Sequence, residues 1–90
     1  MTVTVRYFGQ AQRAAGVAVE EVSAADGCTA EALLRLLAER HGEALRRLIV
    51  TDAGRARPST LLFVGAAQVE ATAPLRDGDA VTLLTPMAGG

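Results

Sequence analysis

A single amphipathic helix near the middle of the chain limits how the remaining segments can fold. Thr29 precedes this segment as a candidate N-cap, and Gly42 follows it as a candidate stop signal. Between them, four apolar residues recur at the i, i+3, i+4, i+7 spacing of one helical face: Ala30, Leu33, Leu34 and Leu37. A helix with one apolar stripe must bury that stripe against a second layer, so the flanking segments have to supply this layer.

The flanking segments have the alternating apolar and polar pattern of β-strands. Two such runs precede the helix, at residues 2–8 and 17–23, and three follow it, at 60–64, 68–70 and 80–84. The order strand, strand, helix, strand, short strand, strand predicts the fold class α+β, with a mixed five-stranded sheet packed on one main helix. This arrangement is the β-grasp roll, and it leaves the second face of the sheet partly open.

Two shorter segments and one turn complete the expected architecture. Residues 10–15 form a short helical segment closed by Gly16, and residues 43–50 form a second short helix. Asp77 and Asp79 flank a glycine before the last strand, which is a tight-turn signal. We expect both carboxylates to accept hydrogen bonds in this turn and not to act in acid–base catalysis.

The composition indicates one domain and excludes several classes of function. The chain has 90 residues, half of them hydrophobic, and a net charge of −1. This charge argues against a nucleic-acid partner, and no apolar run approaches the roughly 20 residues of a membrane span. The first residues lack a basic stretch followed by an apolar segment, so we expect a cytoplasmic protein without a signal peptide.

The chain has one cysteine and one histidine, which gives no recognisable metal site. Cys28 lies just before the main helix, where a thiolate would be favoured, but no partner motif supports a nucleophile. We expect a small buried side chain instead. His41 lies in the last turn of the helix, where its simplest role is that of a surface residue compensating the helix dipole.

The chain closes on two glycines, Gly89 and Gly90, which follow the last predicted strand and a short neck that contains Pro86. We expect residues 1–84 to form the folded domain and residues 85–90 to form a flexible tail. A carboxylate on a tail without side chains at its end is a chemical handle, and we interpret it as the working part of the protein. All nine basic residues are arginine, so the chain has no lysine on which such a tail could be joined.

Several of these segments together resemble the ubiquitin-fold sulfur carriers of the MoaD/ThiS-like family, closest to the small subunit of molybdopterin synthase. The matching residues run through most of the chain: Arg6-Tyr7-Phe8, Arg13, Gly16, Arg40-His41-Gly42, residues 74–79 and Val81 to Gly90. The last fifteen residues are the specific part of the match, whereas the rest is general for the fold.

The resemblance implies a carrier that is not an enzyme on its own and binds no cofactor or metal. A partner adenylyltransferase of the ubiquitin-activating type would consume ATP to adenylate Gly90, and sulfur would then replace AMP to give a thiocarboxylate, 1-thioglycine. The acceptor would be a large synthase subunit, in molybdopterin (molybdenum cofactor) biosynthesis. The tail would enter the partners' channels through four residues before Gly90: Pro86, Met87, Ala88 and Gly89.

The alternation of the last strands also predicts where partners dock. If Leu62 points to the helix, Leu61 and Phe63 point to the open sheet face, and Leu84 faces out beside the tail. These three residues are the candidate docking surface.

Two alternatives use the same tail. The protein could be a ubiquitin-like modifier conjugated through Gly90 to lysines of other proteins. It could also carry sulfur for thiamin, cysteine, tRNA or another thiolation pathway. A third possibility is a β-grasp adaptor that only binds partners.

Overall fold

The computed structural model describes residues 1–85, and the predicted tail residues Pro86, Met87, Ala88, Gly89 and Gly90 lie outside the described residues. The described elements follow one another in this order: β1 (Thr2–Phe8), α1 (Gln10–Ala15), β2 (Val19–Ser23), α2 (Ala30–His41), α3 (Glu43–Ile49), β3 (Leu61–Val64), β4 (Ala67–Val69) and β5 (Ala80–Leu84). None of these helices is long and apolar enough to cross a membrane.

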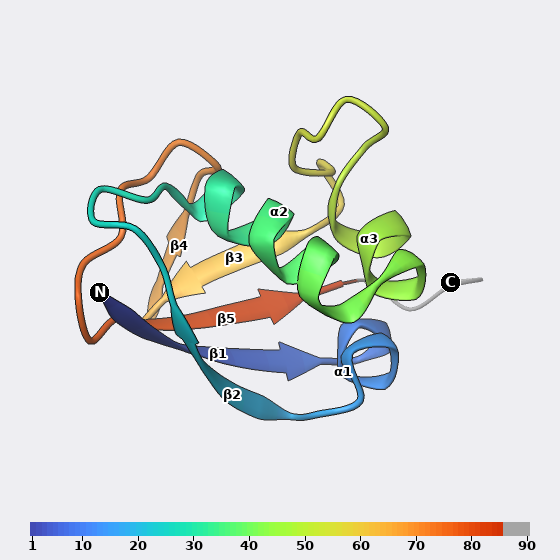
Figure 1. Ribbon diagram of the computed structural model, residues 1–90, viewed down its shortest axis with the longest axis horizontal. Helices are drawn as coiled ribbons and strands as arrows, with labels where there is room; N and C mark the ends of the chain where they lie inside the picture. The colour runs from blue at the N-terminus through green and yellow to red at the C-terminus, as the bar shows by residue number, and fades with distance from the viewer. Residues whose placement is uncertain (86–90) are drawn as a thin grey trace.

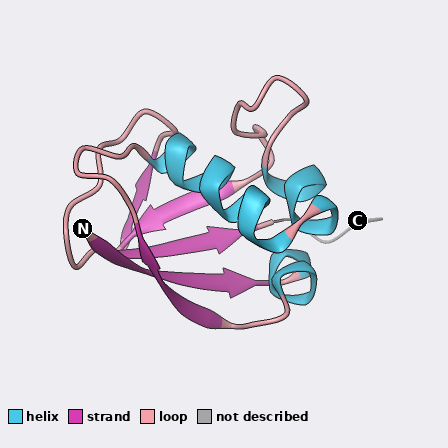
Figure 2. Ribbon diagram, viewed as in Figure 1, coloured by secondary structure: helices cyan, strands magenta, loops and turns pink. Residues whose placement is uncertain are grey.

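The five strands form one mixed sheet in the order β2-β1-β5-β3-β4. The two strands at the ends of the chain, β1 and β5, pair in parallel, and the other neighbours pair antiparallel. Helix α2 crosses one face of this sheet, and α1 and α3 lie together near one end of it (Figure 1 and Figure 2). The predicted α+β fold, a mixed five-stranded sheet on one main helix, is confirmed.

Helix α2 has the boundaries and the buried face that its sequence predicts. The Thr29 hydroxyl accepts a hydrogen bond of 3.2 Å from the backbone N–H of Ala32, which caps the first turn. Gly42 ends the helix at φ +92°, a conformation that favours glycine, and its N–H donates to the Ala38 carbonyl. The apolar stripe is fully buried: Ala30, Leu33, Leu34 and Leu37. Each buried leucine contributes about 2 kcal/mol through the area it removes from water.

The inner face of the sheet supplies the layer on which this stripe packs. Its fully buried side chains come from the central strands β1 and β5 and from the edge strand β2: Val3, Val5, Tyr7, Val22, Val81 and Leu83. Because successive side chains of a strand point to opposite faces, the intervening positions are left on the side away from α2.

Some boundaries differ from the predicted ones by one or two residues. Strand β2 begins at Val19 and not at Val17, since the chain leaves α1 through Gly16 in the left-handed conformation and joins β1 only where the Ala18 carbonyl accepts the Tyr7 N–H. Strand β3 begins after Thr60, whose N–H donates to the Arg57 carbonyl in a turn. These local hydrogen bonds are not visible in the alternation pattern.

The turn before β5 fastens the two parallel strands to each other. Asp77 accepts a 2.7 Å hydrogen bond from the Thr2 N–H, and Asp79 accepts one of 2.8 Å from the Arg76 N–H. Gly78 also donates to the Thr2 carbonyl. Both aspartates therefore have the hydrogen-bonding role predicted for them, and the bonds of Asp77 and Gly78 to Thr2 align the start of β5 with β1.

Cys28 is partly buried and packs against the core. Its thiol donates to the Thr29 carbonyl at 3.3 Å. Burial raises the pKa of the Cys28 thiol, and the charge of Arg35 offsets this only in part. A thiol with a raised pKa is a poor nucleophile at neutral pH, so the geometry fits the predicted packing role.

The prediction for His41 was wrong, because its side chain is not a surface residue of the helix end. His41 is only 14% exposed and donates through Nε2 to the Glu20 carboxylate on β2. The buried Tyr7 hydroxyl donates to the same carboxylate oxygen, and Arg40 donates to the other oxygen at 3.1 Å. The Tyr7 and His41 rings pack edge to face, 5.7 Å apart.

This Glu20 cluster (Tyr7, Glu20, Arg40 and His41) joins the end of α2 to β1 and β2. Burial raises the pKa of the Glu20 carboxyl, but hydrogen bonds from Tyr7, His41 and Arg40 and the charge of His41 outweigh burial and leave this pKa below its ordinary value. Burial and the hydrogen bond to Glu20 raise the pKa of Tyr7. Tyr7 therefore remains a neutral donor and Glu20 a charged acceptor at neutral pH.

We expect Glu20→Gln to lower the free energy of unfolding at pH 7 by about 1–2 kcal/mol, because charged acceptors form stronger hydrogen bonds than amides. A carboxyl with a lowered folded pKa stabilises the fold above its unfolded pKa of about 4.3 and loses this contribution as the pH falls. The difference between wild type and Glu20→Gln should thus shrink between pH 5 and pH 3 in urea unfolding.

Glu39→Gln is the matched control, because it removes the same charge from an exposed position of α2. A stability difference for Glu20→Gln that stays constant with pH, or equals that of Glu39→Gln, would contradict this role of the cluster.

Candidate functional site

The sheet face away from α2 carries three large apolar side chains in one row. Phe8 ends β1, Leu84 ends β5 and Leu61 begins β3, and the strand register places Leu84 opposite both of the others. Their exposed fractions are 46% for Phe8, 38% for Leu84 and 37% for Leu61. We call Phe8, Leu84 and Leu61 the apolar row, and it is a surface suited to covering by a partner.

The predicted orientation of the β3 side chains agrees with their burial. Leu62 is 4% exposed and belongs to the core, whereas Leu61 next to it is exposed. Phe63 pairs with Thr82 on β5, one step along the face from the apolar row, and is half-buried. The structure thus brings Leu61 and Leu84 together and sets Phe63 beside them; that these residues dock a partner stays a prediction.

Sequence reasoning missed Phe8 as a member of this surface. The alternation in β1 already put Phe8 on the opposite side from Tyr7. Its position beside Leu84 depends on the parallel pairing of β1 with β5, which joins segments more than seventy residues apart. An exposed aromatic residue at a strand end was the available signal, but its neighbours could not be assigned.

The predicted tail starts at the same end of the sheet as the apolar row. Thr85 follows Leu84 directly and is only 4% exposed, and its hydroxyl has no hydrogen-bond partner among the described residues. Gly9, at φ +62°, lies so close that a Cβ there would stand 3.3 Å from the Thr85 carbonyl oxygen. The chain that leaves β5 therefore packs against the turn between β1 and α1, one residue after the exposed Leu84.

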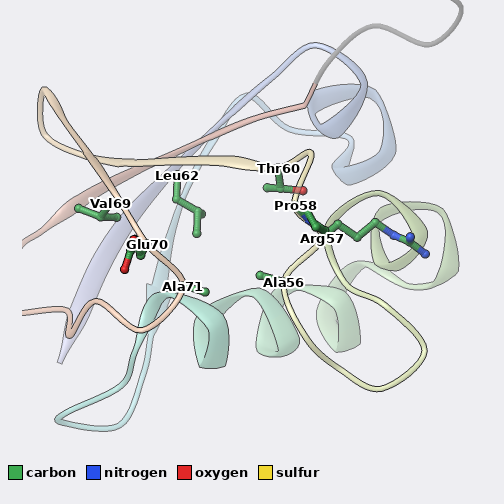
Figure 3. A pocket seen from close by; sticks show the side chains of 8 residues that line it. All are labelled: Ala56, Arg57, Pro58, Thr60, Leu62, Val69, Glu70 and Ala71. Carbon is green, nitrogen blue, oxygen red and sulfur yellow. The ribbon is translucent and has the colours of Figure 1, made fainter.

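The described residues form no metal site that competes with this surface. In residues 1–85, no three His, Cys, Asp or Glu side chains are grouped so that they could hold a metal ion. A hollow of about 230 Å³ lies between the segment before β3, the β3–β4 hairpin and the two residues that follow β4 (Figure 3).

The lining of this hollow offers little to a ligand. The Thr60 hydroxyl already donates to the Leu48 carbonyl at 3.1 Å. The guanidinium of Arg57 extends away from the other labelled side chains in Figure 3. Leu62 and Val69 give the hollow apolar walls. The eight lining residues therefore bring no group of polar side chains to one point.

Comparison with solved structures shows the same fold in small ubiquitin-like proteins. SAMP1 from Haloferax volcanii superposes with a TM-score of 0.88 at 20% identity, with 100% of both chains covered. The putative molybdopterin converting factor subunit 1 from Pyrococcus furiosus gives a TM-score of 0.78 at 26% identity and covers 97% of this chain and 99% of that one.

A third structure contains a complex. The protein–protein complex of subunits 1 and 2 of molybdopterin-converting factor from Helicobacter pylori 26695 matches with a TM-score of 0.62 at 23% identity, with 100% of both chains covered. The described fold is thus the ubiquitin-like β-grasp.

No curated protein is matched by the sequence. The family model of the ThiS family, by contrast, matches residues 5–90, which is almost the whole chain and includes both closing glycines. The structural neighbours and this match agree in fold and extent. The chain belongs to the ThiS family of ubiquitin-like sulfur carriers.

Proposed function

We propose that this protein carries sulfur as a thiocarboxylate on Gly90, which a partner adenylyltransferase first activates with ATP. The observation that carries the proposal is the meeting of two features at one end of the sheet. Leu84, the middle residue of the apolar row, ends β5, and the segment that holds the two glycines starts one residue later. The family match through residue 90 supports the same assignment.

The chemistry explains why activation is needed. A C-terminal carboxylate has a pKa near 3.5, so at pH 7 it is ionised and resists nucleophilic attack. One carboxylate oxygen attacks the α-phosphorus of ATP, pyrophosphate leaves, and an acyl adenylate forms. A persulfide of the partner system then attacks the acyl carbon, and AMP leaves with the oxygen to give an acyl disulfide. A second thiol of the partner system attacks the donor sulfur, forms a disulfide with it and releases the thiocarboxylate.

The domain supplies docking in this scheme, and the active sites belong to the partners. Because Thr85 is buried in the domain, the five residues from Pro86 to Gly90 would provide the reach. Fully extended, they span roughly 17 Å, enough to enter a channel while the sheet face stays on the partner's surface. Glycine lacks a Cβ, so Gly89 and Gly90 let the channel close around the backbone. Pro86, Met87 and Ala88 would form the part of the tail that connects the domain to the reacting end.

For the sulfur acceptor, we propose the large subunit of a molybdopterin synthase. The similarity to the Pyrococcus furiosus subunit 1 supports this acceptor, and so does the fold match to a chain of the Helicobacter pylori complex of subunits 1 and 2. Thiamin, cysteine and tRNA thiolation use the same activated tail and differ only in the acceptor. ATP-dependent activation is chemistry of the cell interior, which favours the cytoplasm.

A second candidate function is protein modification through an isopeptide bond from Gly90. The fold match to SAMP1, whose name describes a small archaeal modifier protein, favours keeping this candidate. The acceptor amines would have to come from other proteins, because the chain contains no lysine. The two functions differ in product: a carrier ends as a free thiocarboxylate, whereas a modifier ends as an amide.

We expect Gly89→Val to block adenylation, because a β-branched side chain cannot enter a channel that closes around the backbone. AMP formation by the adenylyltransferase encoded in the same genome should fall at least tenfold with this variant at equal carrier concentration. The thermal midpoint should not change. Ala88→Val is the matched control, since it adds bulk where a Cβ already exists and should cost less activity. Normal AMP formation with Gly89→Val would contradict the proposed role of the tail.

We expect Leu84→Asp to weaken binding to the adenylyltransferase by about tenfold or more, because a charge in the apolar row must lose its water when the partner docks. Since Leu84 is exposed, the free energy of unfolding should fall by less than about 1 kcal/mol. Binding is measured by calorimetry, with Ala44→Asp on the exposed side of α3 as the control. Equal binding by both variants would show that the partner does not cover Leu84.

A further inference from the structure

Arg6 lies on the open sheet face beside the apolar row, and it makes no ion pair among the described residues. It lies on β1, two residues before Phe8, and its side chain is exposed. Among the described residues, no ion pair or hydrogen bond of its guanidinium is formed. Five other arginines are paired with carboxylates on α2, α3 or β2: Arg35, Arg40, Arg46, Arg47 and Arg55.

The strand register surrounds Arg6 with neutral side chains. Thr82 on β5 and Val19 on β2 lie directly opposite it, and Val19 is 50% exposed. Phe8 follows on the same strand face. The acidic residue of this face that lies nearest in register is Glu21, which is opposite Thr4 and makes no ion pair with Arg6. The open face thus presents one cation at the border of the apolar row.

A partner that covers the apolar row must also cover Arg6 or its immediate surroundings. Removing a guanidinium from water without a counter-charge is strongly unfavourable, and a carboxylate opposite it restores the lost interactions through two parallel hydrogen bonds. A surface that is only apolar, or that is basic at this point, is therefore rejected. Arg6 can distinguish between partners that the apolar row alone would accept equally.

We propose that Arg6 is a specificity-determining residue of the docking face, and that the adenylyltransferase surface covering the apolar row carries an aspartate or glutamate opposite it. This inference rests on the proposed function and adds the chemistry of the partner surface. It assigns to Arg6 the selection of the partner, and to Phe8, Leu84 and Leu61 the apolar contact area.

The test uses the full-length protein and the purified adenylyltransferase encoded in the same genome, with carrier-dependent AMP formation as the readout. Arg6→Glu should raise the KM for the carrier by at least about tenfold while kcat stays within about twofold, because docking and not chemistry is affected. Arg76→Glu is the matched control. Arg76 is exposed in the turn before β5, at the other end of the sheet, so this variant has the same net charge without touching the face.

Salt dependence and charge exchange give independent readouts. The KM of the wild type should rise with NaCl concentration more steeply than that of Arg6→Ala, which lacks the charge pair. One Asp→Arg or Glu→Arg substitution in the enzyme's docking surface should restore low KM to Arg6→Glu and not to the wild type. Unchanged circular dichroism and thermal midpoints verify that the variants are folded.

The outcomes distinguish a failure of the role of Arg6 from a failure of the carrier function. Equal KM values for Arg6→Glu and Arg76→Glu, with normal activation of the wild type, would overturn the role of Arg6 and leave the carrier function standing. A wild-type protein that the enzyme does not adenylate at all would overturn both. A raised KM for Arg6→Glu that a charge exchange in the enzyme repairs would establish the pair.

Discussion

The packing of the α2 stripe against one face of the sheet is the interaction on which the rest of the structure depends. It places Leu33, Leu34 and Leu37 in the core and uses up the inner positions of the strands. Because strand side chains alternate, burying one face fixes what the other face presents. The exposed row of Phe8, Leu84 and Leu61 is thus a direct consequence of the helix packing, and the same sheet that stabilises the domain carries the proposed docking surface.

The parallel pairing of β1 with β5 connects this surface to the proposed chemistry. It brings the first and last strands of the chain together at the centre of the sheet, so the start of the tail lies beside the end of β1. The hydrogen bond from the Thr2 N–H to Asp77 aligns the two strands at one end, and the bond from the Arg76 N–H to Asp79 closes the turn before β5. At the other end of the two strands, Gly9 after β1 lies close to the Thr85 carbonyl after β5. A partner that holds the apolar row therefore also fixes the point from which the tail starts.

Local patterns in the sequence were enough to predict the elements and much of the fold. The i, i+3, i+4, i+7 spacing and the Thr29 cap identified α2, and alternation identified the strands and the outward direction of Leu61 and Leu84. Contacts between distant segments could not be predicted in this way. The Glu20 cluster unites residues of β1, β2 and α2, and His41 alone carries no signal that a carboxylate lies across from it. The place of Phe8 in the apolar row could not be predicted for the same reason, because only the pairing of β1 with β5 sets it beside Leu84.

The central claim is that Gly90 carries sulfur, and mass spectrometry of the intact protein tests it most directly. The protein is produced together with its adenylyltransferase and a sulfur source, and both the intact chain and its C-terminal peptide are weighed. The account predicts a gain equal to the exchange of one oxygen for one sulfur, located on Gly90 and absent without the adenylyltransferase. An unchanged mass at Gly90, while the same enzyme forms AMP on this carrier, would contradict sulfur carriage.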